Sequence, residues 1–448
     1  MKVRTIRDYA QAFSGYAFSA NDLVDVGYPV LKIGNIQNYH IEKETESFYN
    51  GEITEKIRKY QLQKDDFLIA MTGAGSVGRA GKMIDFEEGY LVNQRVAIIR
   101  PYIEKTDSRY LFYYFSMNYV EKYLYNLGIG AGQPNISAND ILKTKVLFPE
   151  LDKQRKIGEI LSAYDELIEN NNKRIKILEQ MAENLYKEWF VRFRFPGHET
   201  TEFENGLPKG WKSCKLRDIA SEVGKSINSD KRDTYNYYLP IDSIPNKSMG
   251  LTEVNDIENA ESSLHTFKKG DILFGSMRPY FHKVLLAPFD GITRKTCFVI
   301  NAKNKKYSDW LYLLMYQQST VAFATTVCVG STMPYVRPQD LFRMNIILPD
   351  ENIVQAFSKK VSPILNRISL FFFENQNLIK QRDMLLPRLM SGKLEVGEKQ
   401  EKVLKFKPKK TFVEFKNEFK AAARKDGGLT EQDLQELYRA YCDDSLDE

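Results

Sequence analysis

The chain repeats itself at an offset of 200 residues, and this repeat constrains the fold more than any other feature. "SRYLFYYFS" at Ser108 aligns with "SDWLYLLMY" at Ser308, and "GAGQPNISANDILKTKVLFPE" from Gly130 aligns with "GSTMPYVRPQDLFRMNIILPD" from Gly330. A period of about 200 residues is too long for a solenoid of short stacked units. We therefore expect two related domains in tandem, each followed by its own connector.

The first part of each repeat predicts a mixed α/β domain. In the first copy, "YPVLKIGNI", "DDFLIAM" and "RVAIIRP" are short β-rich runs, and one helix is expected around 108–125.

The chain has 448 residues, more than a single hydrophobic core usually supports. No apolar run approaches the ~20 residues that cross a bilayer, so no membrane association is expected.

The second part of each repeat predicts a long helix. Apolar residues recur at alternating spacings of three and four over about four heptads, which is typical of a coiled coil. Each seam contains one asparagine, which either fixes the register of the pair or lies at a solvated edge. The predicted seam residues are Ile157, Leu161, Ile168, Asn171, Leu178, Leu185, Phe357, Val361, Ile368, Asn375, Leu378 and Leu385.

The order of these parts predicts the architecture. A first helix of about 34 residues carries the chain about 50 Å, and a second helix on the same seam must return antiparallel. The expected fold class is mixed α+β, with two tandem α/β domains separated by two long helices in an antiparallel coiled coil of approximate two-fold symmetry. The expected boundaries are 1–150 and 196–350 for the domains, 151–195 and 351–396 for the helices, and 397–448 for a helical tail of unknown role.

A glycine motif follows one predicted strand in "FLIAMTGAGSVGRAGKM". Gly73, Gly75 and Gly78 match the G-x-G-x-x-G spacing of a dinucleotide-binding turn, which must open a helix. The following residues instead predict strand, turn and strand, and the second copy keeps only Gly275. A nucleotide-dependent enzyme is therefore a weak alternative, and we expect the glycines to let the backbone approach a phosphate or base edge.

Other catalytic and metal signatures are missing from the sequence. The four cysteines form no C-x-x-C pair, and the four histidines form no H-E-x-x-H motif, so a zinc site is not expected. The N-terminus has no apolar segment typical of a signal peptide, and we expect a cytoplasmic protein. The net charge of +5 is compatible with a nucleic-acid partner without requiring one.

The order of motifs resembles one family. "KDDFLIAMTGAGSVGRAG", "NQRVAIIRP", "GAGQPNIS" and "LFPELDKQRKIGEILSAYDELIENNN" are similar to the specificity subunit of type I restriction-modification systems, and the second copy repeats the series. The resemblance covers about residues 1–396. It implies a non-catalytic subunit whose two target-recognition domains each read one half of a bipartite site in double-stranded DNA.

The resemblance also implies partners and cofactors. Two methyltransferase (modification) subunits would dock on the long helices, and restriction/translocase subunits would join them. S-adenosylmethionine, ATP and Mg²⁺ would belong to those partners, with no cofactor on this chain. Two alternatives remain: a subunit of a related type II-like system, and a two-headed coiled-coil scaffold for proteins that reads no DNA.

Candidate DNA contacts follow from the chemistry of base readout. Arginine pairs with guanine, and asparagine or glutamine with adenine, from loops or strands that reach a groove. For each candidate, the alternative is an ordinary solvated surface residue. The expected DNA-binding residues are Arg79, Lys82, Gln94, Arg95, Gln133 and Asn135 in the first domain, and Arg278, Tyr280, His282, Lys283, Arg294, Lys295 and Arg337 in the second.

Overall fold

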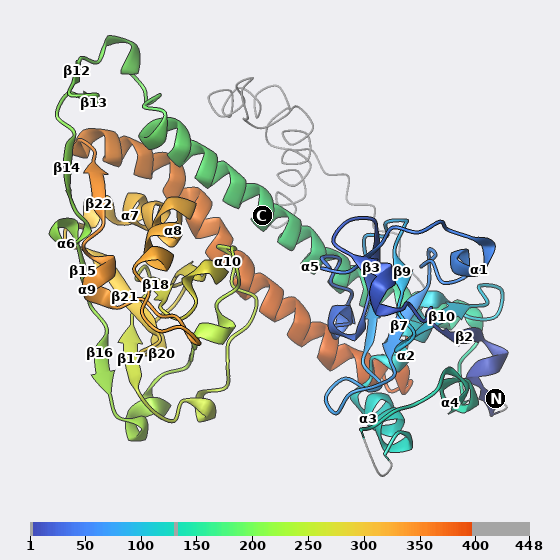
Figure 1. The fold of residues 1–448 in the computed structure, drawn as a ribbon. Helices are drawn as coiled ribbons and strands as arrows, with labels where there is room; N and C mark the ends of the chain where they lie inside the picture. Colours follow the sequence, from blue (N-terminus) through green and yellow to red (C-terminus); the bar gives the residue numbers. More distant parts are fainter. Residues whose placement is uncertain (1–2, 130–132, 397–448) are drawn as a thin grey trace, which may run out of the picture. The chain divides into compact units, whose positions relative to one another are not determined.

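A computed structural model describes residues 3–129 and 133–396 (Figure 1). The predicted tail at 397–448 lies outside the described residues. The described chain forms two compact units: the first contains the residues up to Asn170 together with those from Asn377 onward, and the second contains Asn171–Gln376. Each long helix therefore contributes one part of its length to each unit.

The first unit is built on a five-stranded sheet. Its order is β2-β10-β7-β8-β5, antiparallel except for the β5–β8 pair. The central strands β7 and β10 are almost fully buried, as the continuous apolar runs "FLIA" and "VAII" predict. The strands are β2 (Ala10–Ser14), β5 (Tyr39–His40), β7 (Phe67–Ala70), β8 (Ala80–Lys82) and β10 (Val96–Pro101).

Shorter elements complete this unit. The prediction of a single helix around 108–125 is wrong, because two helices, α2 and α3, occur there. Buried Met117 has an extended backbone and separates them, and the Ser116 hydroxyl donates a hydrogen bond to the Phe112 carbonyl. A second sheet has the order β3-β6-β4-β9, and β1 pairs with β11. These elements are β1 (Arg4–Thr5), β3 (Leu23–Val24), β4 (Tyr28–Leu31), β6 (Phe48–Tyr49), β9 (Leu91–Val92), β11 (Lys145–Val146), α1 (Glu55–Arg58), α2 (Ser108–Phe115), α3 (Asn118–Leu127) and α4 (Ala138–Lys143).

The second unit repeats this topology. Its main sheet, β15-β21-β18-β19, is antiparallel and corresponds strand for strand to β2-β10-β7-β8. The β14–β22 pair corresponds to β1–β11, so the internal repeat is a repeat of connectivity as well as of sequence. The elements are β14 (Lys212–Lys215), β15 (Ala220–Glu222), β18 (Ile272–Gly275), β19 (Val284–Leu286), β21 (Cys297–Ala302), β22 (Asn345–Leu348), α6 (Leu216–Ile219), α7 (Ser308–Tyr316), α8 (Gln318–Thr326) and α9 (Pro338–Leu341).

Additional strands distinguish the second unit from the first. A three-stranded sheet has the order β16-β17-β20, and β12 and β13 form a hairpin. The strands are β12 (Phe203–Glu204), β13 (Leu207–Pro208), β16 (Lys225–Ile227), β17 (Leu264–Phe267) and β20 (Gly291–Arg294).

The long helices α5 (Leu151–Tyr186) and α10 (Glu351–Met390) pack against each other within both units (Figure 1). The N-terminal part of α5 meets the C-terminal part of α10 in the first unit, and the reverse holds in the second, so the pairing is antiparallel. Of the predicted seam residues, Ile157, Leu161, Asn171, Phe357, Val361, Ile368 and Asn375 are buried, whereas Ile168, Leu178, Leu185, Leu378 and Leu385 are half-buried.

Buried polar contacts attach each domain to these helices. In the first unit, Asp165 of α5 accepts hydrogen bonds from Tyr113 and from Arg382 of α10. In the second unit, the Glu179 carboxylate accepts from the backbone N–H of Met249 at 2.6 Å and of Gly250 at 3.0 Å. These bonds satisfy charges that would be costly to bury unpaired.

Candidate nucleic-acid interface

Three loop segments of the first unit are joined by backbone hydrogen bonds. Met71 donates to the Arg95 carbonyl at 3.0 Å, and Ile136 donates to the Met71 carbonyl at 2.9 Å. Gly73 donates to the Pro134 carbonyl at 3.2 Å. The segments enclose a hollow of about 420 Å³. We call the exposed side of residues 71–79, 93–95 and 133–135 the first loop surface.

The glycine motif forms the turn between β7 and β8. Gly73 and Gly78 have φ of 111° and 86°, a left-handed region that favours glycine. A Cβ on Gly78 would lie 2.8 Å from the Glu121 carbonyl oxygen, whereas a Cβ on Gly75 would meet open space. Because β8 follows the turn directly and no helix opens there, the dinucleotide interpretation is excluded.

Four of the six residues predicted in the first domain have exposed side chains on the first loop surface. They come from two separate segments that the hydrogen bonds above bring together. Amide groups predominate, with one guanidinium beside them. The four residues are Gln94, Arg95, Gln133 and Asn135.

The other two predicted residues of the first domain have half-buried side chains. Arg79 folds back on the glycine turn, where it donates to the Gly75 carbonyl and, at 3.3 Å, to the Ile36 carbonyl. The Lys82 ammonium lies 3.7 Å from the Asp65 carboxylate with its side chain 16% exposed, and burial lowers its pKa. Both side chains are occupied by structural contacts.

The second unit builds the same arrangement. Ser276 donates to the Thr296 carbonyl at 2.8 Å, and Val336 donates to the Ser276 carbonyl at 2.9 Å. Arg278, at the position of Gly73, donates to the Pro334 carbonyl at 2.8 Å. We call the exposed side of residues 276–282, 294–296 and 333–335 the second loop surface.

Four predicted residues have exposed side chains on the second loop surface: Arg278, Tyr280, Arg294 and Lys295. Arg278 has φ of 46°, unusual for a residue with a side chain. This conformation turns the chain after β18 so that the short segment Pro279–Phe281 presents its aromatic side chains to solvent.

The remaining predicted residues of the second domain have structural partners. His282 is buried, its Nε2 lies 2.8 Å from the Tyr316 carbonyl oxygen, and burial lowers its pKa. Lys283 donates to the Ile241 carbonyl at 2.8 Å. Arg337 is exposed at the start of α9, where its guanidinium pairs with Asp340. His282 is therefore buried in the second unit, and the half-buried Lys283 ammonium is held by a backbone carbonyl.

Four residues of these surfaces were not predicted. Thr72 lines the first hollow, and Phe281, Met333 and Tyr335 lie exposed on the second loop surface. Met333 and Tyr335 occupy the repeat positions of Gln133 and Asn135, so the offset of 200 is a signal that identifies them.

Both loop surfaces lack acidic residues. None of the six segments that form them contains aspartate or glutamate, whereas they carry the exposed cations Arg95, Arg278, Arg294 and Lys295. This charge pattern suits a polyanionic ligand. Among the described residues, no cluster of three or more histidine, cysteine, aspartate or glutamate side chains suits a metal ion.

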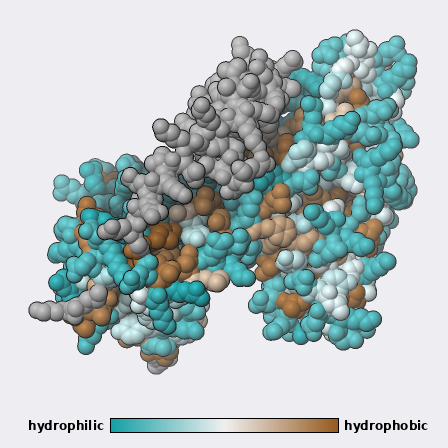
Figure 2. Space-filling view, turned by 180° about the vertical axis from the view of Figure 1, so that it is seen from behind, coloured by the Kyte–Doolittle hydropathy of each residue, from teal (hydrophilic) through white to brown (hydrophobic). Residues whose placement is uncertain are grey.

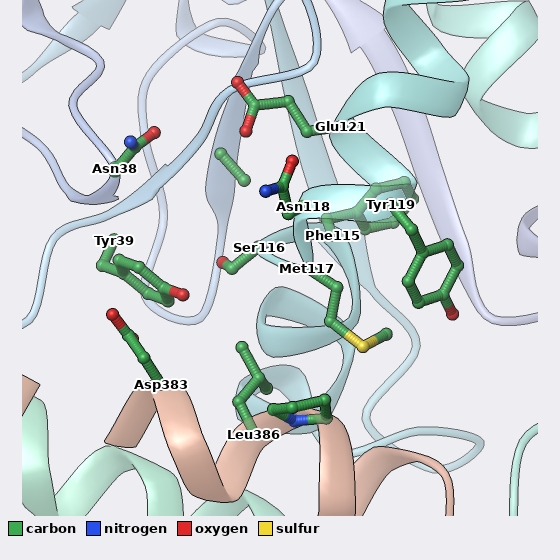
Figure 3. Close-up of a pocket in the computed structure, with 12 residues that line it drawn as sticks. Asn38, Tyr39, Phe115, Ser116, Met117, Asn118, Tyr119, Glu121, Asp383 and Leu386 are labelled. Atoms are coloured by element: carbon green, nitrogen blue, oxygen red, sulfur yellow. The ribbon is translucent and has the colours of Figure 1, made fainter. Parts of the chain in front are cut away.

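A separate hollow of about 480 Å³ lies in the first unit where the α2–α3 junction faces α10 (Figure 3). Figure 3 shows Asp383 and Leu386 of α10 opposite Tyr39 and Met117. The neighbouring Arg382 guanidinium stacks 3.4 Å above the centroid of the Tyr39 ring. This hollow therefore borders the attachment of the first domain to its helices and is distinct from the loop surfaces.

Sequence comparison identifies the family. Residues 1–180 and 208–380 match the type I restriction modification DNA specificity domain. The chain belongs to this family. It is a specificity subunit, the non-catalytic component that recognises the DNA target of a type I restriction-modification enzyme, and S-adenosylmethionine and ATP are used by its partner subunits.

Individual relatives agree with this assignment. The chain is 28% identical over 310 residues to the type I restriction enzyme MjaIX specificity subunit of Methanocaldococcus jannaschii, covering 65% of this chain and 70% of the relative. The putative MjaX specificity subunit of the same organism is 23% identical, covering 88% of this chain and 94% of the relative. The crystal structure of the S subunit from M. genitalium has the same fold, with a TM-score of 0.54, 14% identity, and coverage of 88% of this chain and 96% of that one.

The family assignment settles one alternative. The chain is a DNA-recognition subunit, so the scaffold without DNA readout is set aside. No helix in the described part of the chain is long and apolar enough to cross a membrane.

Proposed function

We propose that the two loop surfaces are the DNA-reading surfaces of this specificity subunit, each reading one half of a bipartite, asymmetric target. The proposal rests on one observation: the same pattern of backbone hydrogen bonds joins three segments in each unit, and the side chains on those segments differ between the units. Gln133 and Asn135 in one copy correspond to Met333 and Tyr335 in the other. Two similar frames with different side chains suit two half-sites of different sequence. We place the recognition domains at residues 1–150 and 196–350.

The surfaces have the chemistry that this role requires. Phosphate contacts position a protein on DNA, and contacts to base edges supply specificity. Arg95, Arg278 and Lys295 supply cations, while amide, hydroxyl and aromatic groups lie next to them on the same segments. We assign the cations mainly to phosphates and the neighbouring side chains mainly to bases.

We further propose that two methyltransferase subunits dock on the outer faces of α5 and α10, and that restriction subunits join this assembly in the cytoplasm. Hydrophobic side chains interrupt a mainly hydrophilic surface (Figure 2). On the long helices, Leu167 is 50% exposed in the first unit and Leu370 is 49% exposed in the second. Phe373, one turn along α10 from Leu370, is 36% exposed, and neighbouring exposed apolar side chains on one helix face are typical of an interface that a partner covers.

The reading proposal is tested by co-expression with the methyltransferase subunit, followed by single-molecule sequencing of host DNA for methylated bases. We expect a bipartite motif with a fixed gap. Gln133→Ala with Asn135→Ala should alter one half only, Met333→Ala with Tyr335→Ala should alter the other, and Gln63→Ala, an exposed change outside both surfaces, should alter neither. A motif unchanged by both double variants, while methylation persists, contradicts the proposal.

The docking proposal has its own test. Leu370→Glu should abolish co-purification with the methyltransferase subunit, because a charge replaces an apolar contact. Leu127→Glu, on α3 with 48% of the wild-type side chain exposed, is the matched control and should leave co-purification intact. Equal recovery of both complexes argues against docking at this part of α10.

A further inference from the structure

The two loop surfaces differ in the base chemistry they present. The first carries the amides of Gln94, Gln133 and Asn135, all exposed. A side-chain amide both donates and accepts, and this combination matches the N6 and N7 atoms of adenine in the major groove. The Thr72 hydroxyl borders the same hollow.

The second loop surface presents apolar groups at the corresponding place. Met333 is 58% exposed, Tyr280 52%, Tyr335 44% and Phe281 41%. Four large apolar side chains left exposed on two joined segments indicate a surface that a ligand covers. Met333 and Tyr335 come from one loop, and Tyr280 and Phe281 come from the turn after β18.

The backbone holds these side chains in place. Val329 and Tyr335 exchange two backbone hydrogen bonds of 2.9 and 3.0 Å, which close the loop that carries Met333. The rings of Tyr280 and Phe281 pack against each other with centroids 4.9 Å apart. Preorganised side chains lose less conformational entropy when they bind.

The charges next to this apolar group identify its partner. Arg278, Arg294 and Lys295 are exposed on the same surface, and its three segments contain no acidic residue. An apolar group surrounded by cations suits a DNA groove, where phosphates flank the bases. The apolar feature of the major groove is the 5-methyl group of thymine.

We infer that the half-site read by the first loop surface contains adenine recognised by Gln133 and Asn135, and that the half-site read by the second contains thymine whose 5-methyl group is recognised by Met333 and the adjacent aromatic side chains. This inference rests on the proposed assignment of one half-site to each loop surface and adds which base each surface recognises.

The test uses the complete complex with its methyltransferase subunits, the target found by sequencing, and modified oligonucleotides in equilibrium binding. Deoxyuridine in place of thymine removes only the 5-methyl group. 7-Deazaadenine in place of adenine removes only the N7 acceptor. Because these changes are made in the DNA, the wild-type protein gives the primary result, and folding of a variant is not at issue.

Deoxyuridine should weaken binding about fourfold per recognised methyl group in one half-site, the factor expected for one buried methyl-sized group. 7-Deazaadenine should weaken binding several-fold in the other half-site. The uridine effect should disappear in Met333→Ala with Tyr335→Ala, and the deaza effect in Gln133→Ala with Asn135→Ala. Phe203→Ala, an equally exposed aromatic change on β12, should retain both effects.

The outcomes separate the inference from the proposed function. If the complex binds its bipartite target but tolerates deoxyuridine throughout, or if the positions altered by Met333→Ala with Tyr335→Ala are not A·T pairs, the inference is wrong and the reading surfaces stand. The inference is also overturned if the positions that depend on Gln133 and Asn135 are not A·T pairs. If neither double variant alters the motif, the proposed function itself fails.

Discussion

The side chains of Asn171 and Asn375 meet in the seam between the long helices. The Asn171 amide donates to Asn375 Oδ1 at 2.8 Å, and the Asn375 amide in turn donates to Asn172 Oδ1 at 3.1 Å. Both seam asparagines are buried, with 6% and 9% of their surface exposed. One polar pair inside an apolar seam disfavours other registers, because a shifted helix would bury both amides without partners.

This pair predicts that replacing one asparagine lowers the free energy of unfolding more than replacing both. Asn375→Leu removes two hydrogen bonds and leaves the Asn171 amide unsatisfied, at a cost of about 1–3 kcal/mol in the free energy of unfolding. Asn171→Leu with Asn375→Leu should recover most of that loss, because no buried amide then lacks a partner. Urea unfolding of the three proteins measures the difference. Additive losses in the double variant contradict the assigned coupling.

Alanine substitutions at two positions of the glycine turn should affect the free energy of unfolding differently. Gly78→Ala should destabilise the chain by about 1–3 kcal/mol, because an alanine must adopt the left-handed backbone. Its Cβ would also lie 2.8 Å from the Glu121 carbonyl. Gly75→Ala is the matched control, since its Cβ meets open space, and its unfolding curve should overlay the wild type. Equal stability of both variants would show that the turn tolerates rearrangement.

Glu179 predicts a specific pH dependence. Burial raises its pKa above the ordinary value, although the Ser248 hydroxyl and the backbone of Met249 and Gly250 lower it. The folded carboxyl therefore holds its proton more tightly than the unfolded one. Its contribution to stability grows as the pH falls through the folded-state pKa and becomes constant below the unfolded value. Above the folded-state pKa the contribution is at its lowest.

Glu179→Gln removes this titration, so it isolates the effect from that of other carboxyl groups. Between pH 7 and pH 4, wild type should gain unfolding free energy relative to the variant, by about 1.4 kcal/mol per unit of pKa difference. Urea unfolding at several pH values gives the difference. A wild type that loses stability relative to the variant on acidification would show that the hydrogen bonds outweigh burial.

Two basic residues of the first domain are expected to behave differently in DNA binding. Arg95→Ala should weaken binding and reduce the slope of log K against log salt by about 1, because one phosphate contact is lost. Lys82→Ala should leave the slope unchanged, because its ammonium lies beside Asp65. Salt titrations of both variants, with exposed Arg58→Ala as control, measure the slopes. An unchanged slope for Arg95→Ala would remove it from the phosphate contacts.

The sequence by itself determined the architecture. The offset of 200 between Ser108 and Ser308 predicted a duplicated domain, and the strand orders of the two main sheets confirm it. The spacing of three and four predicted two long helices, which occur as α5 and α10. The repeat and the apolar spacing are both visible in the sequence because residues on the buried face of a helix or strand must be apolar at regular positions.

Only the tertiary structure decided which candidate side chains face outward. Arg278 and His282 are four residues apart and were predicted together, yet one is exposed and the other buried. Both have left-handed backbones, with φ of 46° and 54°. Arg79 likewise bonds to the carbonyl of Ile36, forty-three positions away. Side-chain direction in a turn depends on such backbone angles and on contacts between distant segments, and residue type and spacing specify neither.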